Sequence, residues 1–244
     1  MILNTLIISI LGLLGLPLAG MIAILLSEVR GKKFKKTVQT AITIPNFISW
    51  IIIYSIMFSL FSNDGLLTTL VRGLSGNRDS TVTLLTNPGT AKLFMVLTNI
   101  WKTVGYNSII FFAAVTGIDS QLYDAAAVDG AGRWQKILHI TIPGILPTFI
   151  TLLIISVGAI LNNGFEQYYV FVNPMIQKNI EVLDYYVYRI GMLNNDIPAS
   201  TAVSMIKTFI SVVLVFSVNK LSKKTLGQSI FCLLYTSPEP TRPY

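Results

Sequence analysis

The sequence of 244 residues has very little cysteine, histidine or charge. Its single cysteine, Cys232, excludes an internal disulfide framework and any cysteine-rich metal site. Its single histidine, His139, argues against a histidine metal centre and against a Ser/His triad. Only 12% of the residues are charged, against about 25% in an average soluble domain. The sequence contains no glycine-rich loop ending in Gly-Lys-Ser/Thr, so we do not expect this chain to hydrolyse ATP itself.

Apolar residues are abundant instead, at 52% of the chain, and the mean hydropathy is +0.66. These values are too high for an ordinary soluble domain. Several apolar runs are long enough to cross about 30 Å of hydrocarbon as helices. The predicted spans are residues 2–26, 38–61, 92–115, 144–161 and 201–218. We therefore predict an all-α, polytopic transmembrane helical bundle, multi-pass in the cell membrane.

The basic residues lie between these spans. A formal charge of +7 would suit nucleic acid if it formed a stripe on a soluble face, but this distribution indicates membrane topology, with some attraction to anionic lipid. The segments expected in the cytoplasm hold ten Lys/Arg residues, five of them within residues 28–36, whereas the outer loops hold four. The positive-inside rule therefore places the polar segment 119–143 in the cytoplasm, and no nucleic-acid partner is expected.

The polar segment 119–143 lies between the third and fourth spans and predicts a helix-turn-helix elbow at the membrane surface. Asp119 or Ser120 can cap a short helix, and Gly130 and Gly132 allow a sharp turn. Apolar residues then repeat at helical spacing on a second short helix, which Pro143 is expected to close. From this pattern alone, the elbow could rest in the lipid headgroups or dock on a protein.

The elbow carries a gapped motif. Asp124-Ala125-Ala126, then Gly130, then Ile140-Thr141-Ile142-Pro143 resemble the EAA signature of binding-protein-dependent ABC transporter permeases, with Asp in place of Glu and Ile142 in place of Leu. Residues 161–174 and 184–191 are similar to oligosaccharide and polysaccharide permeases of this class. The resemblance implies that the elbow is a coupling helix that docks on a separate ATPase. The implied coupling residues are Asp124, Ala125, Ala126, Asp129, Gly130, Ile140 and Pro143.

The resemblance implies an ATP-driven importer, with a carbohydrate as solute. The expected partners are ABC ATPase subunits, a different second permease subunit, an extracellular solute-binding protein and membrane lipid. No cofactor is expected in this chain, because the partner ATPase uses the ATP. The permease domain is expected to cover residues 1–231 and to lack the family's first helix. The tail 232–244 resembles no family ending and is expected to be disordered or artefactual.

A polar stripe marks the third span. Asn99, Lys102 and Tyr106 follow one another at helical spacing, and a lysine near mid-helix costs about 2.5 to 3.5 kcal/mol on insertion scales, so it should face protein or water. The stripe either lines the translocation path or forms hydrogen bonds between helices. The polar break after the fourth span either meets the solute or is an ordinary helix cap. The predicted path residues are Asn99, Lys102, Tyr106, Asn163, Phe165, Glu166 and Gln167.

Three further features have local interpretations. Pro45 should kink the second span and free a carbonyl that neighbours must satisfy. Residues 66–74 fit a short interfacial helix. Tyrosines of the loop 166–199 suit sugar faces or the interfacial belt of a membrane protein.

The alternative function is an ion-coupled secondary carrier of a small polar solute. Such carriers commonly use an acidic residue inside the bilayer, whereas every Asp and Glu here lies in a loop or at the end of a span. A membrane-embedded enzyme is also disfavoured, because the spans contain no cluster of His, Cys and carboxylate.

Overall fold

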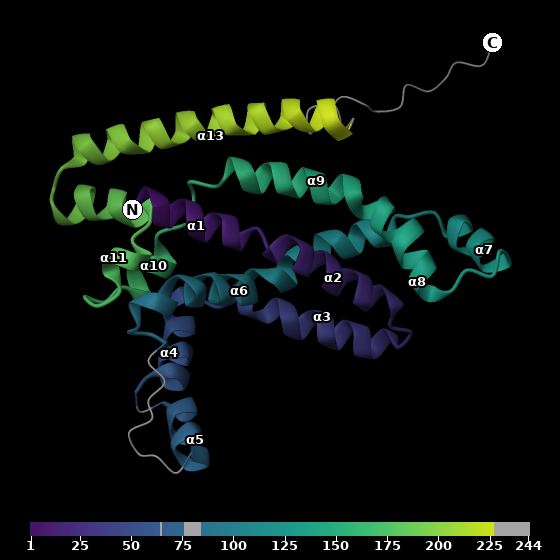
Figure 1. The fold of residues 1–244 in the computed structure, drawn as a ribbon, viewed down its shortest axis with the longest axis horizontal. Helices are drawn as coiled ribbons and strands as arrows, with labels where there is room; N and C mark the ends of the chain where they lie inside the picture. The colour runs from purple at the N-terminus through teal and green to yellow at the C-terminus, as the bar shows by residue number, and fades with distance from the viewer. Residues whose placement is uncertain (64, 76–83, 227–244) are drawn as a thin grey trace.

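The computed structural model describes residues 1–63, 65–75 and 84–226, and these residues form helices joined by short connections (Figure 1). The predicted all-α class is confirmed. The tail 232–244 lies outside the described residues. The elements are α1 (Ile2–Gly12), α2 (Gly15–Glu28), α3 (Lys32–Phe47), α4 (Trp50–Phe61), α5 (Leu66–Ser75), α6 (Pro88–Thr116), α7 (Ser120–Val128), α8 (Arg133–Lys136), the π-helix η1 (Ile137–Thr141), α9 (Ile142–Gly158), α10 (Glu166–Phe171), α11 (Gln177–Ile180), α12 (Leu183–Tyr188), the π-helix η2 (Arg189–Leu193) and α13 (Ile197–Leu226).

The long helix α6 is the centre of the bundle. It packs against α1, α2, α3 and α9. It begins where the Asn87 side chain accepts a hydrogen bond from the Gly89 N–H at 2.9 Å. Pro88 fits the first turn because a backbone N–H at this position would have no partner within the helix. Because helices pack against several sides of α6, polar residues on those sides can face protein instead of lipid, whereas Leu93 and Leu97 are exposed.

Four helical stretches among the described residues are long and apolar enough to cross a membrane. Helix α6, which contains the predicted span 92–115, is long enough, but its polar stripe lowers its hydropathy below that of these four stretches, so its place as a span stays a prediction. The four stretches are Ile2–Glu28, Trp50–Gly73, Arg133–Gly158 and Ile197–Lys224.

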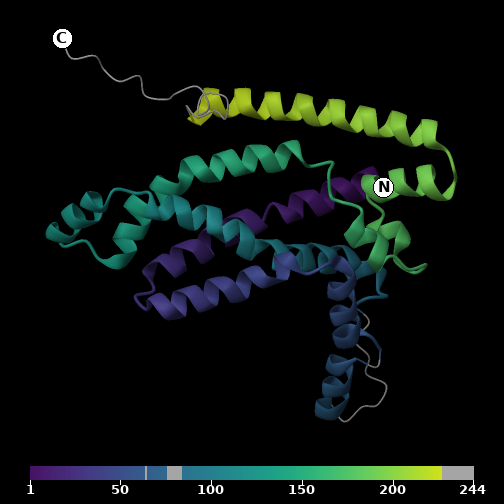
Figure 2. The ribbon, with the colours of Figure 1, turned by 180° about the vertical axis from the view of Figure 1, so that it is seen from behind.

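The two ends of the bundle differ in charge. The basic α2–α3 connection, the elbow and the C-terminal part of α13 lie at one end, and α10 to α12 lie at the other (Figures 1 and 2). Lys223 and Lys224 are in the last turn of α13, and Arg133 and Lys136 are in α8. The basic segments that were assigned to the cytoplasm from sequence are therefore gathered at one end of the fold.

The predicted second span, residues 38–61, is broken in the structure. Helix α3 ends at Phe47, Ile48 is extended with φ −82° and ψ 135°, and α4 begins at Trp50. Helices α4 and α5 then turn away from the bundle (Figure 1). Pro45 lies within the last turn of α3, where its missing N–H and ring weaken the helix, so the predicted kink becomes a complete break.

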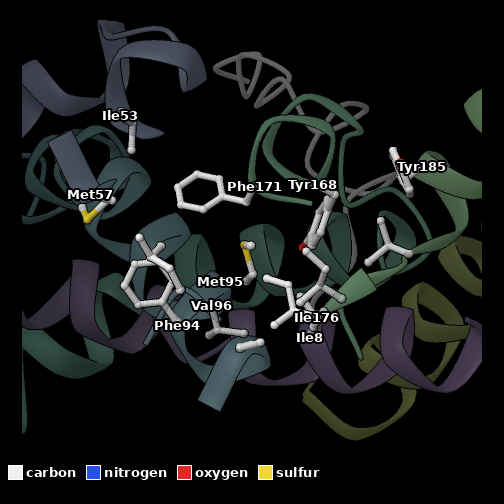
Figure 3. Packing of buried hydrophobic residues seen from close by; sticks show 14 residues of the cluster. Ile8, Ile53, Met57, Phe94, Met95, Val96, Tyr168, Phe171, Ile176 and Tyr185 are labelled. Atoms are coloured by element: carbon white, nitrogen blue, oxygen red, sulfur yellow. The ribbon is translucent and has the colours of Figure 1, made fainter. Parts of the chain in front are cut away.

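Two clusters of buried apolar side chains hold the helices together. The larger joins α1, α4 and α6 to α10, α11 and α12, and Figure 3 shows the Phe171 ring lying between Met57, Phe94 and Met95. The Phe94 and Phe171 ring centroids are 6.1 Å apart. The second cluster joins α2, α6 and α9 around Phe111, which is fully buried. The segment α10 to α12, predicted only as an outer loop, is thus packed onto the bundle.

Helix α13 is longer than the predicted span 201–218 and is attached mainly along one face. It packs against α9, α12 and η2. Lys207 forms an ion pair with Asp184 of α12, and both side chains are largely buried. Apolar residues such as Met205 and Phe209 are exposed, as expected for a surface in contact with lipid.

Candidate functional site

The elbow forms from local signals. The Asp119 carboxylate accepts a hydrogen bond from the Gln121 N–H at 2.9 Å and caps α7. Helix α7 ends where Gly130 adopts φ +74°, a left-handed conformation that strains any residue with a Cβ. The Gly132 N–H then donates to the Gln135 side chain at 2.6 Å, which opens α8. The predicted first helix, its cap and its turn are confirmed.

Pro143 does not close the second helix as predicted. Residues Arg133–Gly158 form one helical stretch that passes through η1 into α9. In the π-helical turn the Ile142 N–H donates to the Ile137 carbonyl, five residues earlier, and Pro143 follows in the first turn of α9. The π turn shifts the hydrogen-bond pattern just where proline supplies no donor, so the helix continues.

A hollow of about 310 Å³ lies between the two arms of the elbow. Of the predicted coupling residues, the structure brings four together in its lining, whereas Asp124, Ala125 and Pro143 are exposed outside it. Tyr123 braces the arms, since its hydroxyl lies 2.9 Å from that of buried Thr141. The four lining residues are Ala126, Asp129, Gly130 and Ile140.

Large apolar side chains on the elbow were not recognised as exposed from sequence. Val128 is 88% exposed and Trp134 is 75% exposed, and Leu122 on α7 is also exposed. None of the residues of α7 is buried. The elbow therefore presents bulky apolar groups as well as the low-relief alanines. The signal available for Val128 was its place as the last residue of α7, two residues before the left-handed Gly130.

A second cavity of about 310 Å³ lies in the bundle between α1, α2, the end of α3, α6 and the break after α9. Amides and hydroxyls line it beside apolar residues, and we call it the polar cavity. The predicted path residues Asn99, Tyr106 and Asn163 line it, together with Asn46 and Asn107, which sequence reasoning did not select. None of its lining residues in the described part of the chain is charged. Its hydrogen-bonding groups are amides and hydroxyls, which can both donate and accept.

The break after α9 is tied to the bundle by side-chain amides. The Asn163 carbonyl oxygen accepts from the Ser9 hydroxyl at 2.7 Å. The Gln167 amide donates to the Met95 carbonyl at 2.8 Å, and its oxygen accepts from the Asn99 amide at 3.3 Å. Gln167 is only 2% exposed and is absent from the cavity lining. Gln167 is therefore placed as a brace between α6 and α10.

Lys102 is also turned away from the cavity. Its ammonium donates to the carbonyls of Pro45 at 3.1 Å and Asn46 at 3.0 Å, and to that of Ile48. Of the two interpretations of the polar stripe, the structure gives Lys102 the hydrogen bonds between helices, whereas Tyr106 keeps its place in the cavity wall.

Phe165 and Glu166 lie at the outer end, outside the cavity lining. The Phe165 ring stacks on Tyr188 with centroids 4.9 Å apart, and Tyr169 meets Tyr188 edge-on at 5.4 Å. Buried Tyr168 lies beneath and lines the cavity. Burial, and then the Asp184 carboxylate, raise the pKa of Tyr168, so its phenol stays neutral and can donate a hydrogen bond.

A family model described as the binding-protein-dependent transport system inner membrane component matches residues 4–226. The chain belongs to this family. As an ABC permease it is a membrane transport subunit and not an enzyme, and permeases of this family work with an ATPase and a second permease. Membership decides against the ion-coupled secondary carrier.

Individual relatives of this permease match over most of its length. It is 37% identical to protein LplB of Bacillus subtilis (strain 168) over 230 residues, which cover 93% of this chain and 71% of LplB. It is 38% identical, with the same coverage, to the polygalacturonan/rhamnogalacturonan transport system permease protein YteP of the same strain. Among solved structures, a bacterial alginate ABC transporter in complex with an alginate pentasaccharide-bound periplasmic protein matches with a TM-score of 0.87 and 33% identity, covering 94% of this chain and 79% of that one.

Proposed function

We propose that this permease lines half of the path by which an oligosaccharide enters the cell, and that the polar cavity is its solute-contacting part. The observation that carries the proposal is the uncharged lining of that cavity. Asn46, Asn99, Asn107 and Asn163 present amides, and Tyr106 presents a hydroxyl, all of which pair with sugar hydroxyls. Gly12 and Gly15 add small surfaces that let a bulky ring approach the backbone.

Two similarities support a carbohydrate as the solute. YteP is a polygalacturonan/rhamnogalacturonan permease, and the matched crystal structure is an alginate transporter. That structure also holds a periplasmic protein carrying the saccharide. We extend the arrangement to this chain, with an extracellular solute-binding protein on the side of α10 to α12. A second, different permease subunit would complete the path.

The elbow is the proposed docking site of the ATPase, which uses the ATP. Helix α7 buries none of its residues within this chain, and the elbow hollow offers Ala126 and Gly130 as a close-fitting floor with Asp129 as a polar rim. Exposed Val128 and Trp134 would be covered on docking. The alternative is that these side chains insert into the lipid headgroups, because exposed apolar groups also suit that environment.

The uptake test uses the purified complex of both permeases and the ATPase in proteoliposomes with the solute-binding protein. The probes are radiolabelled oligogalacturonides, alginate oligosaccharides and maltooligosaccharides, with glutamine as a non-sugar control. ATP-dependent accumulation of at least one saccharide series, and none of glutamine, is the expected result. Accumulation of glutamine without any saccharide would refute the carbohydrate assignment.

Cysteine cross-linking tests the docking assignment separately. With Cys232→Ser as background, Val128→Cys should cross-link to the ATPase with a short bifunctional reagent, whereas Met205→Cys, an exposed position on α13, should not. Reaction of Val128→Cys with lipid-dissolved reagents alone would assign the elbow to the headgroups.

A further inference from the structure

The N–H donors of the Lys102 ammonium all bind carbonyls at one helix end. Lys102 lies midway along α6 and is only 9% exposed. Its ammonium carries three donors, and three carbonyls accept from it, those of Pro45, Asn46 and Ile48. The Trp50 ring lies over the same ammonium, with its centroid 5.3 Å from Nζ. No donor is left to bind a solute.

The three carbonyls belong to the break between α3 and α4. The carbonyls of Pro45 and Asn46 are among the last four of α3, which have no partner within the helix, and inside a membrane water does not replace that partner. The Pro45 carbonyl also accepts from the Ile48 N–H, at 3.2 Å. A cation at a helix C-terminus is also favoured by the helix dipole. Lys102 therefore stabilises the end of α3 at Phe47, in addition to the contact between α3 and α6.

The neighbouring turn of α6 fixes the register of this contact. A Cβ on Gly105 would lie 1.9 Å from the Ile42 carbonyl oxygen, so the backbones of α3 and α6 touch there. Lys102 and Gly105 lie on one face of α6 because they are three residues apart. Together they hold the last two turns of α3 by its main chain, Gly105 at Ile42 and Lys102 at Pro45 and Asn46.

The contacts of Lys102 and Gly105 with α3 fix the position of Asn46. Its main-chain carbonyl is bound by Lys102, and Asn46 lines the polar cavity together with Asn99 and Asn107 of α6. An unbroken helix through residues 46–50 would point this side chain in a different direction. We infer that Lys102 is a positioning residue of the translocation path, which acts by holding the broken end of α3 so that Asn46 forms part of the cavity wall.

The inference rests on the proposed function, because the cavity is the one assigned there to the solute. Its experiment needs no solute. In a Cys232→Ser background, Asn46→Cys is introduced into the full transporter complex, and the rate of reaction with the polar reagent trimethylammonium-ethyl methanethiosulfonate is measured with and without Lys102→Met. Asn107→Cys is the matched control, because it lines the same cavity from α6 but is not held by Lys102.

With Lys102 intact, both cysteines should react. Lys102→Met should lower the rate at position 46 by about tenfold or more, since it leaves the buried carbonyls of Pro45, Asn46 and Ile48 without their charged donor, and losing such hydrogen bonds disturbs a site by at least the 1.4 kcal/mol that a tenfold change represents. The rate at position 107 should change by less than about twofold, well within that tenfold scale. An unchanged rate at position 46, or an equal fall at both positions, overturns the inference.

Two results remain decisive if the Lys102→Met complex does not assemble. Asn46→Cys must react with Lys102 present, and it must still react in Lys102→Arg, which retains the charge and the donors. Loss of reaction in either protein overturns the positioning role. Because saccharide uptake is not measured here, failure of this labelling pattern and failure of the carbohydrate assignment are distinguishable.

Discussion

Gly105→Ala is predicted to force α3 and α6 apart. The new Cβ would meet the Ile42 carbonyl oxygen at 1.9 Å, its carbonyl carbon at 2.4 Å and the Thr43 nitrogen at 3.0 Å. All three are main-chain atoms, so no side-chain rotation can relieve the contact. A carbon and a carbonyl oxygen normally approach to about 3.3 Å, which requires the helices to separate by about 1.4 Å.

The free energy of this displacement follows from packing. Forcing one extra methyl into a well-packed contact typically costs about 1–3 kcal/mol. The separation would also stretch the hydrogen bonds from Lys102 to Pro45 and Asn46, now 3.1 and 3.0 Å, beyond the range in which they hold. Gly105→Ala should therefore lower stability and reproduce the loss of reaction at position 46 that is expected of Lys102→Met.

Thermal unfolding of the purified complex measures the effect. For a chain of this size about 1–3 kcal/mol corresponds to a fall in Tm of about 2–12 °C. Gly73→Ala is the matched control, because a Cβ there meets nothing within 4 Å, and alanine in an open helical position should leave Tm unchanged or slightly raised. If Gly105→Ala and Gly73→Ala gave the same Tm, the close approach of α3 and α6 would be refuted.

Three further predictions follow from the described contacts. Ala126→Trp fills the floor of the elbow hollow and should abolish co-purification of the ATPase while leaving the amount of permease in the membrane unchanged; normal co-purification would contradict docking at this surface. Asp184→Asn leaves Lys207 without its carboxylate and should destabilise the complex by about 3 kcal/mol or more, and adding Lys207→Met should restore part of the Tm; no recovery would show that the ion pair is not the source of the loss. Asp119→Ala removes the cap of α7 and should lower the local stability of this helix by about 1 kcal/mol. Amide exchange should therefore become faster in α7 than in α9 on substitution, and an equal change in the two helices would argue against the cap.

The elbow could be predicted from sequence because its determinants are local. The cap of α7 is Asp119, one residue before the helix, and the turn depends on the left-handed conformation that Gly130 adopts. Neither needs a partner elsewhere in the chain. The continuation through Pro143 was predicted wrongly, because a proline alone indicates an interrupted helix and the π turn that accommodates it has no comparable single-residue signal.

The cavity and the break in the second span depend on contacts between distant residues. The sequence showed that Pro45 would free a carbonyl and that Lys102 must face something polar, but 57 positions separate them. Only the packing of α3 on α6 brings the Lys102 ammonium to the carbonyls of Pro45 and Asn46, and these are not the carbonyl of Ala41 that the missing Pro45 N–H leaves unpaired. In the same way, Asn163 follows α9 in the sequence, yet Ser9 of α1 is the group that holds its side chain in place.

The continuous helical stretch Arg133–Gly158 connects the two candidate sites physically. At one end Ile140 lines the elbow hollow, and near the other Ser156 lines the polar cavity, with Ala159 and Ile160 just beyond the helix. Twenty-six residues span about 39 Å at 1.5 Å per residue, which is about the thickness of a membrane with its headgroups. On the proposed docking of the ATPase at the elbow, we expect a displacement of the elbow to reach the cavity wall through this one helical stretch. Lys102 holds the end of α3, whose Asn46 lines the same cavity, so the proposed solute path would lie between a helix that the ATPase is proposed to move and a helix end fixed from within the bundle.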